Sequence, residues 1–391
     1  MQKYDIHVCL ISGQAAPNLL PILDSQFKPK KAIFLVSASM KDNAQYLANT
    51  FEKKGVKVDQ MTLEDVFDFY MMENQLIDLI AQYEDESIAL NVTGGTKLMA
   101  IAAQQAFSIA GKPIFYLDTE NNRLIFIKTD NNETVPSQQI QAKNDLETYL
   151  SSYGFKLIQK HHKTNQDLAY LSKNFITYYQ DYKNDIPLLN KYASLSEKSG
   201  FKVKIEKEDA RSSSFLDLLK DMSEDHVIHY DEDTKLIDFK NKKTKEFLNG
   251  IWLEEYTYEA IKDIKTIDDI AFSVNVGYHK YQLTKSEYSQ ENKGNKNEFD
   301  VAFIAKNKLH IIECKTQILE KNNGVKAEDI LYKLETLKDY GGLLTKKCLV
   351  SYHKIPDGVH NRARELRIEI IQGQDLQRLK TKIQEWIGKK Q

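Results

Sequence analysis

The chain has 391 residues, of which 41% are hydrophobic and 10% aromatic, and this composition excludes a disordered or low-complexity protein. Its 54 lysines and arginines nearly balance 56 aspartates and glutamates. The resulting net charge of −2 excludes a globally basic nucleic-acid coat, so any nucleic-acid contact must use a local patch. At roughly 100–200 residues per domain, the length predicts two or three domains.

No segment has the character of a membrane span or a secretory signal. The longest weakly polar stretch, residues 98–117, contains two glutamines and a lysine, and it fits a helix followed by a strand better than a membrane helix. The first residues lack a signal-peptide cleavage region. Cys9, Cys314 and Cys348 show neither a disulfide framework nor zinc-ligand spacing. We therefore expect a cytoplasmic protein without a membrane partner.

The first 135 residues alternate between strand and helix patterns. Strands are expected at Asp5–Ser12, Lys31–Ser37, Lys57–Thr62, Ser87–Val92 and Pro113–Asp118. Helices are expected at Lys41–Lys54, Glu64–Glu84 and Lys97–Ala110. Such alternation predicts an α/β domain, residues 1–135, with a doubly wound parallel sheet, to which Arg123–Thr129 adds an antiparallel edge strand.

Three polar clusters follow strands of this predicted sheet. They are Ser12-Gly13-Gln14, Ser37-Ala38-Ser39-Met40 and Thr93-Gly94-Gly95-Thr96-Lys97. Ligands of doubly wound sheets bind beyond the carboxyl ends of the strands, and free N–H groups at a helix start suit an anion. The third cluster is neither a Walker A loop nor a dinucleotide fingerprint. We expect the three clusters to form one site for an anionic ligand.

Residues 136–246 form the predicted middle region. Helical, lysine- and tyrosine-rich stretches precede a hairpin in which Val227–Tyr230 and Leu236–Phe239 flank an acidic turn. Helices followed by a hairpin fit either a winged-helix-like module or a helical linker with one hairpin. The sequence leaves both alternatives open.

The third predicted domain, residues 247–391, contains the strongest catalytic pattern. Two strand patterns, Phe299–Ala305 and Lys308–Thr316, flank a polar turn. A hairpin there pairs residues whose numbers sum to about 613–615. Since side chains alternate along a strand, Glu313 and Lys315 share a face and lie opposite or diagonal to Asp300. Two carboxylates and a lysine at one hairpin end suit a Mg²⁺- or Mn²⁺-assisted hydrolysis.

Two helices flank this hairpin in the sequence. A helix is predicted at Ile251–Ile264, and its apolar stripe places Glu254 on the inward face, where a carboxylate needs a partner such as a metal ion. The later helical stretch Ile330–Tyr340 carries Tyr332, Lys333 and Glu335. These three side chains fit contacts with a substrate backbone as well as they fit an ordinary surface.

Asp300, the triplet Glu313-Cys314-Lys315 and the upstream Glu254 resemble the PD-(D/E)XK restriction-endonuclease-like nucleases. The resemblance implies that Glu254, Asp300, Glu313 and the carbonyl of Cys314 bind Mn²⁺ or Mg²⁺. It also implies that Lys315 acts beside the attacking water. Phe299 stands where the family pattern has proline.

The segment NVTGGTKLMA, with the two preceding clusters, resembles the CARF domain, a Rossmann-like sensor of cyclic oligoadenylates in type III CRISPR defence. A CARF domain followed by a restriction-like nuclease is similar to CRISPR-ancillary nucleases. That resemblance implies a homodimer that shares one cyclic tetra-adenylate between its protomers. The implied substrates are single-stranded DNA and RNA, with nicking of supercoiled DNA as a further activity.

A different class of protein remains as the alternative. In it, the sensor domain would control a winged-helix middle region that binds DNA, and the C-terminal acids would be structural. Convergence of Asp300, Glu313 and Lys315 would discriminate against such a non-catalytic regulator, because it has no reason to keep that arrangement.

Overall fold

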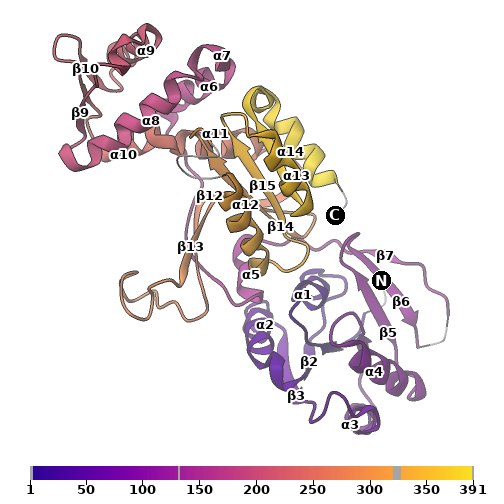
Figure 1. The fold of residues 1–391 in the computed structure, drawn as a ribbon. Coiled ribbons are helices and arrows are strands. Elements are labelled where there is room, and N and C mark those ends of the chain that lie inside the picture. The colour runs from indigo at the N-terminus through magenta and orange to yellow at the C-terminus, as the bar shows by residue number, and fades with distance from the viewer. Residues whose placement is uncertain (1–2, 131–132, 320–326, 390–391) are drawn as a thin grey trace.

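Two large sheets organise the chain, as shown by a computed structural model that describes residues 3–130, 133–319 and 327–389. Figure 1 shows them at different levels of the molecule, with the N-terminal sheet below and a helical middle region at the opposite end. This is the mixed α/β architecture that the alternating sequence pattern predicts. Within the described residues, no helix combines the length and apolarity that a membrane crossing needs.

The first sheet has the strand order β3-β2-β1-β4-β5-β6-β7. Its strands are β1 Ile6–Leu10, β2 Lys31–Val36, β3 Lys57–Thr62, β4 Ile88–Asn91, β5 Ile114–Asp118, β6 Arg123–Lys128 and β7 Gln138–Gln139. Strands β1 to β5 pair in parallel and β6 pairs antiparallel with β5, so the predicted parallel sheet and the antiparallel strand are confirmed. The prediction that this strand forms the edge is wrong, because the two-residue strand β7 pairs outside β6.

The helices of the first domain are α1 Ala16–Leu23, α2 Lys41–Lys53, α3 Phe69–Gln82 and α4 Lys97–Ile109. Helix α1 was not expected, because Pro17 and Pro21 interrupt its pattern, yet Pro17 stands in the first turn, where its missing N–H costs nothing. Helix α3 begins five residues later than predicted, since Asp68 caps it by accepting a hydrogen bond from the Met71 N–H.

The middle region contains the helices α6 Ala169–Thr177, α7 Tyr179–Tyr182, α8 Asp185–Leu195 and α9 Ser213–Glu224. Its strands are β9 Lys202–Lys204, β10 His229–Asp231 and β11 Leu236–Asp238, in the order β10-β11-β9. The predicted hairpin is present as the antiparallel pair β10–β11. The elements α8, β9, α9, β10 and β11 thus follow one another as helix, strand, helix and hairpin.

The second large sheet has the order β16-β15-β14-β13-β12-β8. Its strands are β8 Lys156–His161, β12 Ile267–Gly277, β13 Lys296–Ala305, β14 Lys308–Lys315, β15 Lys346–Ser351 and β16 Ile368–Gln372. The accompanying helices are α5 Leu146–Ser152, α10 Lys242–Glu246, α11 Trp252–Ile261, α12 Ala327–Thr336, α13 Asp357–Glu365 and α14 Leu379–Gly388. Strand β8 comes from the stretch assigned to the middle region but completes this sheet.

The two domains share a hydrophobic core. One cluster of buried side chains includes Phe34 and Phe51 of the first domain together with Phe299 and Leu349 of the second. The side-chain oxygen of Gln14 accepts a hydrogen bond of 3.0 Å from the Leu343 N–H across the same boundary. The domains are therefore joined by burial of apolar surface and by a directional bond.

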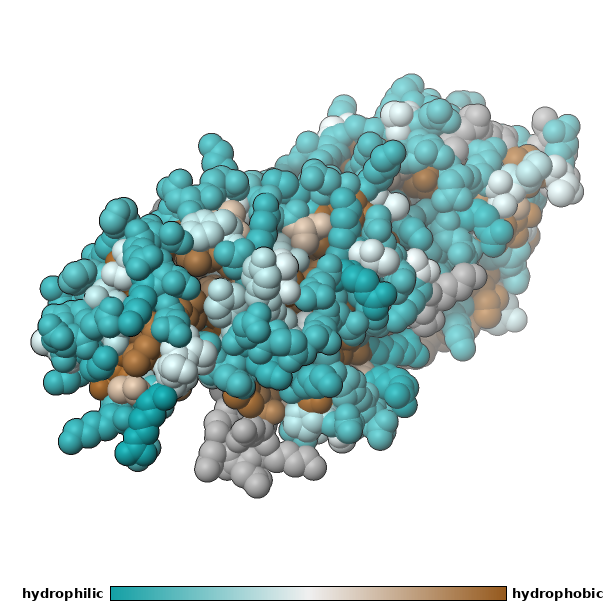
Figure 2. Space-filling model, turned by 90° about the horizontal axis from the view of Figure 1, so that it is seen from above, coloured by the Kyte–Doolittle hydropathy of each residue, from teal (hydrophilic) through white to brown (hydrophobic). Residues whose placement is uncertain are grey.

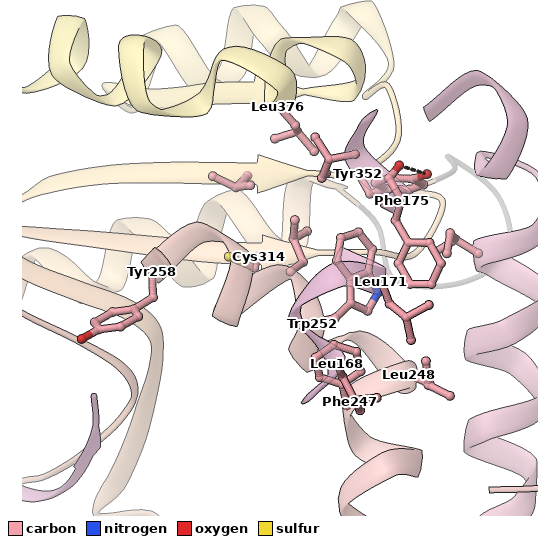
Figure 3. Packing of buried hydrophobic residues seen from close by; sticks show 14 of the residues in the cluster. Leu168, Leu171, Phe175, Phe247, Leu248, Trp252, Tyr258, Cys314, Tyr352 and Leu376 are labelled. Atoms are coloured by element: carbon pink, nitrogen blue, oxygen red, sulfur yellow. Dashed lines mark hydrogen bonds between the residues drawn. The ribbon is translucent and has the colours of Figure 1, made fainter. Parts of the chain in front are cut away.

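A second cluster joins the middle region to the other face of the second large sheet. Figure 3 shows Phe175, Trp252 and Tyr352 packed together, with the Tyr352 hydroxyl bonded to the carbonyl of Phe175. Cys314 belongs to this cluster, on the strand face opposite Glu313. The exterior seen in Figure 2 is mostly hydrophilic, with apolar side chains scattered between charged ones.

Candidate functional sites

The β13–β14 hairpin has the predicted register. Val301 pairs with Ile312 and Ala305 with Lys308, so the residue numbers sum to 613. Beyond the last pair, Asp300 Oδ2 accepts a hydrogen bond of 2.7 Å from the Cys314 N–H. Lys315 Nζ lies 2.7 Å from Glu313 Oε1 and 3.7 Å from Asp300 Oδ2. The structure thus brings Asp300, Glu313 and Lys315 together.

Glu254 reaches the same cluster from α11. The preceding π-helical turn, Phe247–Ile251, contains Gly250 at φ 132°, and a Cβ there would lie 2.9 Å from the Thr316 hydroxyl oxygen. Glycine therefore lets the helix start close to the end of β14. Glu254 Oε2 accepts a 3.1 Å hydrogen bond from the Ser273 hydroxyl. Ser273 has φ 44°, at an irregularity where β12 pairs with β8, and sequence periodicity gave no sign of it.

The carboxylates of the cluster act on one another's protonation. Burial and then the charge of Glu313 raise the pKa of Asp300 to about 6. Burial and the charge of Asp300 raise the pKa of Glu254 well above its ordinary value. Burial alone would also raise the pKa of Glu313, but Lys315 and Lys333 outweigh it and hold that pKa low. Such a concentration of perturbed carboxyl groups is typical of a functional site.

Lys333 of α12 is the fifth charged residue described in this cluster. Its ammonium lies 2.9 Å and 3.0 Å from the two oxygens of Glu313, whose side chain is only 2% exposed. The sequence left Lys333 between a substrate contact and a surface residue, and the structure shows it bound to Glu313. Glu335, two residues along α12 and so on another side of the helix, instead bonds Lys338 and Lys347 outside the cluster.

The carboxylates of the cluster are donors of the kind that a divalent cation binds. The described residues contain no preformed group of three or more histidine, cysteine, aspartate or glutamate side chains that could hold a metal ion. Mg²⁺, however, is commonly held by one or two carboxylates while it keeps several waters. Burial and then the charge of Glu313 raise the pKa of Asp300, and a bound cation would stabilise both carboxylates in their charged form. The residues therefore fit a partly hydrated cation.

Cys314 fits a role for its backbone better than for its thiol. The side chain is buried beside Thr257, and burial raises the pKa of the thiol well above its ordinary value. A thiol in this environment is a poor nucleophile and a poor metal ligand. This agrees with the expectation that its carbonyl, and not its sulfur, would serve a cation.

The three polar clusters of the first domain follow neighbouring strands. Strands β2, β1 and β4 are adjacent and parallel, so their carboxyl ends meet at one edge of the sheet. Ser12-Gly13-Gln14, Ser37–Met40 and Thr93–Lys97 come directly after them. The topology therefore brings the predicted ligand residues to one edge, as the strand pattern indicated.

Several of these side chains already serve their own loops. The Thr93 hydroxyl donates to Asn91 Oδ1 at 2.6 Å and accepts from the Leu117 N–H at 2.7 Å. Thr96 caps α4 by accepting from the Met99 N–H, and a Cβ on Gly94 would meet the Leu10 carbonyl oxygen at 2.1 Å. Ser12 bonds the backbone of Gln14, and Ser37 bonds Ser39. Lys97, by contrast, is exposed at the start of α4.

The side chain of Gln14 is bonded to the domain of the second large sheet and not to the predicted ligand edge of the first sheet. Its side-chain oxygen accepts a 3.0 Å hydrogen bond from the Leu343 N–H, in the loop between α12 and β15. That loop begins at Gly341, the residue bonded by Tyr149. A residue assigned to the ligand by its sequence position thus connects the strand-end edge with the domain of the second large sheet.

A doubly wound domain with a polar strand-end edge, joined to a sheet that carries a carboxylate–lysine cluster, defines a sensor-linked nuclease. Residues 6–149 match the family model of the Card1 CARF domain, and residues 241–390 match that of the Card1-like endonuclease domain. The chain is therefore a CARF domain joined to an endonuclease domain, both of the Card1 type. No curated protein matches it.

Solved structures share the whole fold. Protein VC1899 from Vibrio cholerae is 24% identical, with a TM-score of 0.83 over 98% of both chains. Can2 from Sulfobacillus thermosulfidooxidans, in complex with cyclic tetra-adenylate, is 22% identical, with a TM-score of 0.79 over 99% of this chain and 98% of that one. A type III CRISPR defence DNA nuclease activated by cyclic oligoadenylate has 14% identity and a TM-score of 0.52, covering 91% of this chain and 46% of that one.

Proposed function

We propose that this protein is a metal-dependent endonuclease of type III CRISPR defence, switched on by cyclic tetra-adenylate. The observation that carries the proposal is the meeting of Asp300, Glu313 and Lys315 within 3.7 Å at the end of a core hairpin. The endonuclease family match and the likeness to a Can2 structure that holds cyclic tetra-adenylate support it. We expect the protein to act in the cytoplasm.

Each residue of the cluster has a distinct task in phosphodiester hydrolysis. Glu254, Asp300, Glu313 and the Cys314 carbonyl would hold a Mn²⁺ or Mg²⁺ ion, which when bound supplies Lewis acidity. Lys315 keeps its ammonium beside both carboxylates, since their charges outweigh burial and raise its pKa. There it would orient the attacking water and offset charge on the scissile phosphate. Lys333 keeps Glu313 fixed from the side of α12.

The strand-end edge of the first domain would hold the activator. Exposed Lys97 and the N–H groups at the start of α4 suit a phosphate, while the backbone at Gly13 and Gly95 lets a ligand approach closely. Serine hydroxyls at positions 12, 37 and 39 remain candidates for ribose or phosphate contacts. The proposal for this edge rests on its position and polarity.

A homodimer would share one ring between two such edges. A cyclic tetranucleotide of identical units presents two-fold related halves, and a C₂ dimer presents two copies of one surface. Helix α4, which starts at the ligand edge, exposes Ile101 to 54% and Ile109 to 68%, as expected of a surface that a second copy covers. The proposed stoichiometry is one cyclic tetra-adenylate for two chains.

Single-stranded DNA and RNA are the proposed substrates, with nicking of supercoiled DNA as a further activity. We also propose the three-part division at residues 135 and 246, with β8 contributed by the middle region to the nuclease sheet.

The alternative, a DNA-binding regulator, is disfavoured by the acidic side chains on two elements of the middle region. The helix that would enter a DNA groove, α9, presents Asp217, Asp221 and Glu224, and the hairpin turn carries Asp231–Asp233. Acidic side chains repel phosphates, so these elements are poorly suited to bind a DNA backbone.

The test is cleavage by the purified protein with Mn²⁺, cyclic tetra-adenylate and matched single-stranded DNA and RNA. We expect cleavage that needs both ligand and metal and that EDTA abolishes. Full activity of an Asp300→Ala/Glu313→Ala protein would exclude the proposed site. Sequence-specific duplex binding without cleavage would favour the regulator.

A further inference from the structure

The loop between β12 and β13 projects from the nuclease sheet. We call residues 278–295 the arm. Figure 1 shows it as a long extension beyond the ends of β12 and β13, away from the helices that cover the sheet. A loop of this length in a compact domain usually has a function of its own.

The arm is held in a defined shape by one buried side chain. Asn292 is 1% exposed. Its Nδ2 donates to the carbonyls of Gln282, Lys285 and Ser286 at 2.9–3.1 Å, and its Oδ1 accepts from the Gln282 N–H at 2.7 Å. Because the backbone is fixed from within, the outward side chains need little further ordering to bind a partner.

These outward side chains are cationic and apolar. Glu291 is paired with Lys285, and Glu287 is paired with Lys296 at 2.8 Å, so both acids of the arm are neutralised. Lys280 and Lys293 are exposed and make no ion pair within the described part of the chain. Tyr288 is 83% exposed and Leu283 is 63% exposed.

The arm stands on the strands that carry the catalytic cluster. Its first residue follows Ser273, the partner of Glu254, by five positions, and its last precedes Asp300 by five. At about 3.3 Å per residue, the arm begins roughly 15 Å from the cluster. Its base is fixed by His279, whose ring lies 5.2 Å from that of Tyr46 on α2.

We infer that the arm is a binding surface for a single-stranded nucleic acid, which it holds beside the nuclease site. A fixed scaffold with unpaired lysines and an exposed tyrosine provides the two components of such binding, phosphate attraction and base stacking. A duplex keeps its bases stacked inside and cannot use Tyr288 in this way. The inference rests on the proposed nuclease function and adds where the strand is held.

The experiment compares Lys280→Ser/Lys293→Ser, Tyr288→Ala and the triple variant with a charge-matched control, Lys198→Ser/Lys207→Ser, on the middle region. Binding of labelled DNA and RNA strands of about 20 nucleotides is measured in an Asp300→Ala background, and cleavage is measured in the otherwise unchanged protein. We expect the triple variant to bind roughly tenfold more weakly, with KM raised and kcat unchanged. The slope of log K against log salt should fall by about 1.4, since two phosphate contacts are lost.

Three results would overturn the inference. The first is unchanged strand binding and KM in the triple variant. The second is an equal loss of strand binding in the control variant. The third is loss of the dimer in the triple variant on light scattering, which would assign the arm to contact with a second copy of the chain. The outcome is separable from the proposed function, because a wild-type protein that binds strands without cleaving them contradicts only the nuclease proposal.

Discussion

At the second sheet the candidate catalytic side chains form ion pairs with one another. At the first sheet most candidate ligand-binding side chains instead form hydrogen bonds within or beside their own loops. Asp300, Glu313, Lys315 and Lys333 form one charged network, and neighbouring charges shift the pKa values of the first three. Thr93 and Thr96 instead bond the groups that shape the ligand edge. The candidate catalytic site is therefore recognised by its interacting charges. The candidate ligand-binding edge is recognised mainly by its position at the carboxyl ends of parallel strands.

The largest effect is expected at Asp300. Replacing it by asparagine keeps the shape and the acceptor for the Cys314 N–H but removes the charge. We expect cleavage to fall about a thousandfold while binding of cyclic tetra-adenylate stays unchanged. Asp339→Asn, an exposed neighbour on the nuclease domain, is the matched control for cleavage assays.

The same variant should gain stability in metal-free buffer. The pKa of Asp300 is raised to about 6 in the folded protein, against 3.8 for an ordinary aspartate. Between these two pH values the unfolded chain loses its proton first, so the free energy of unfolding falls as the pH rises through this range. Above about pH 6 the full loss of stability is present. Urea unfolding in EDTA should show Asp300→Asn to be more stable at pH 7.5 by roughly 1–3 kcal/mol, with no difference below about pH 4. A variant less stable at pH 7.5 would mean that Asp300 is not under repulsion.

Lys333→Met is expected to have the next largest effect. It removes one of two cations that hold the buried Glu313, so we expect kcat to fall about tenfold while activator binding remains. Lys333→Arg should recover most of the rate. Lys338→Met, on the next turn, removes an ion pair with Glu335 and serves as the control. Equal losses in both methionine variants would reduce Lys333 to a structural residue.

Contacts between residues close in the sequence could be predicted, whereas contacts between distant residues could not. The hairpin register, with Asp300 beside Glu313 and Lys315, follows from a short turn and a period of two, and the structure confirms that register. The pairing of β8 with β12 and the bond from Gln14 to Leu343 join residues far apart in the chain, and no periodic pattern encodes them. The bulge at Ser273 likewise depends on how two strands meet.

At the ligand edge, two substitutions distinguish a residue expected to bind the ligand from a residue that stabilises the loop. Lys97→Ala removes an exposed charge, so the cyclic tetra-adenylate needed for half-maximal cleavage should rise about tenfold while thermal stability is unchanged. Thr93→Val breaks the bonds to Asn91 and Leu117 and should lower the stability by about 1–3 kcal/mol. Thermal melts and activation curves of both variants are the measurement. A stability loss in Lys97→Ala with an unchanged activation curve would reverse the two assignments.

The smallest effect concerns a feature that both sheets share, a buried neutral histidine. His7 packs between Phe27 and Phe115, at 4.7 Å and 5.1 Å between ring centroids. His310 stacks on Phe303 at 4.6 Å. Burial lowers the pKa of each to about 3. Below the ordinary pKa of 6.5 the unfolded chain binds more protons than the folded one, so stability is lost as the pH falls from about 6.5 toward 3.

We expect His7→Phe and His310→Phe each to reduce the stability lost between pH 7.5 and pH 5 by about 2 kcal/mol, at about 1.4 kcal/mol per pH unit. The control substitution His162→Gln, at an exposed position, should not change the stability lost between these two pH values. Urea unfolding at the two pH values measures this. Because the domains share a buried core, either substitution should act on a single transition. Two separate transitions, each responding to only one histidine, would show that the sheets unfold independently and that their shared core couples them weakly.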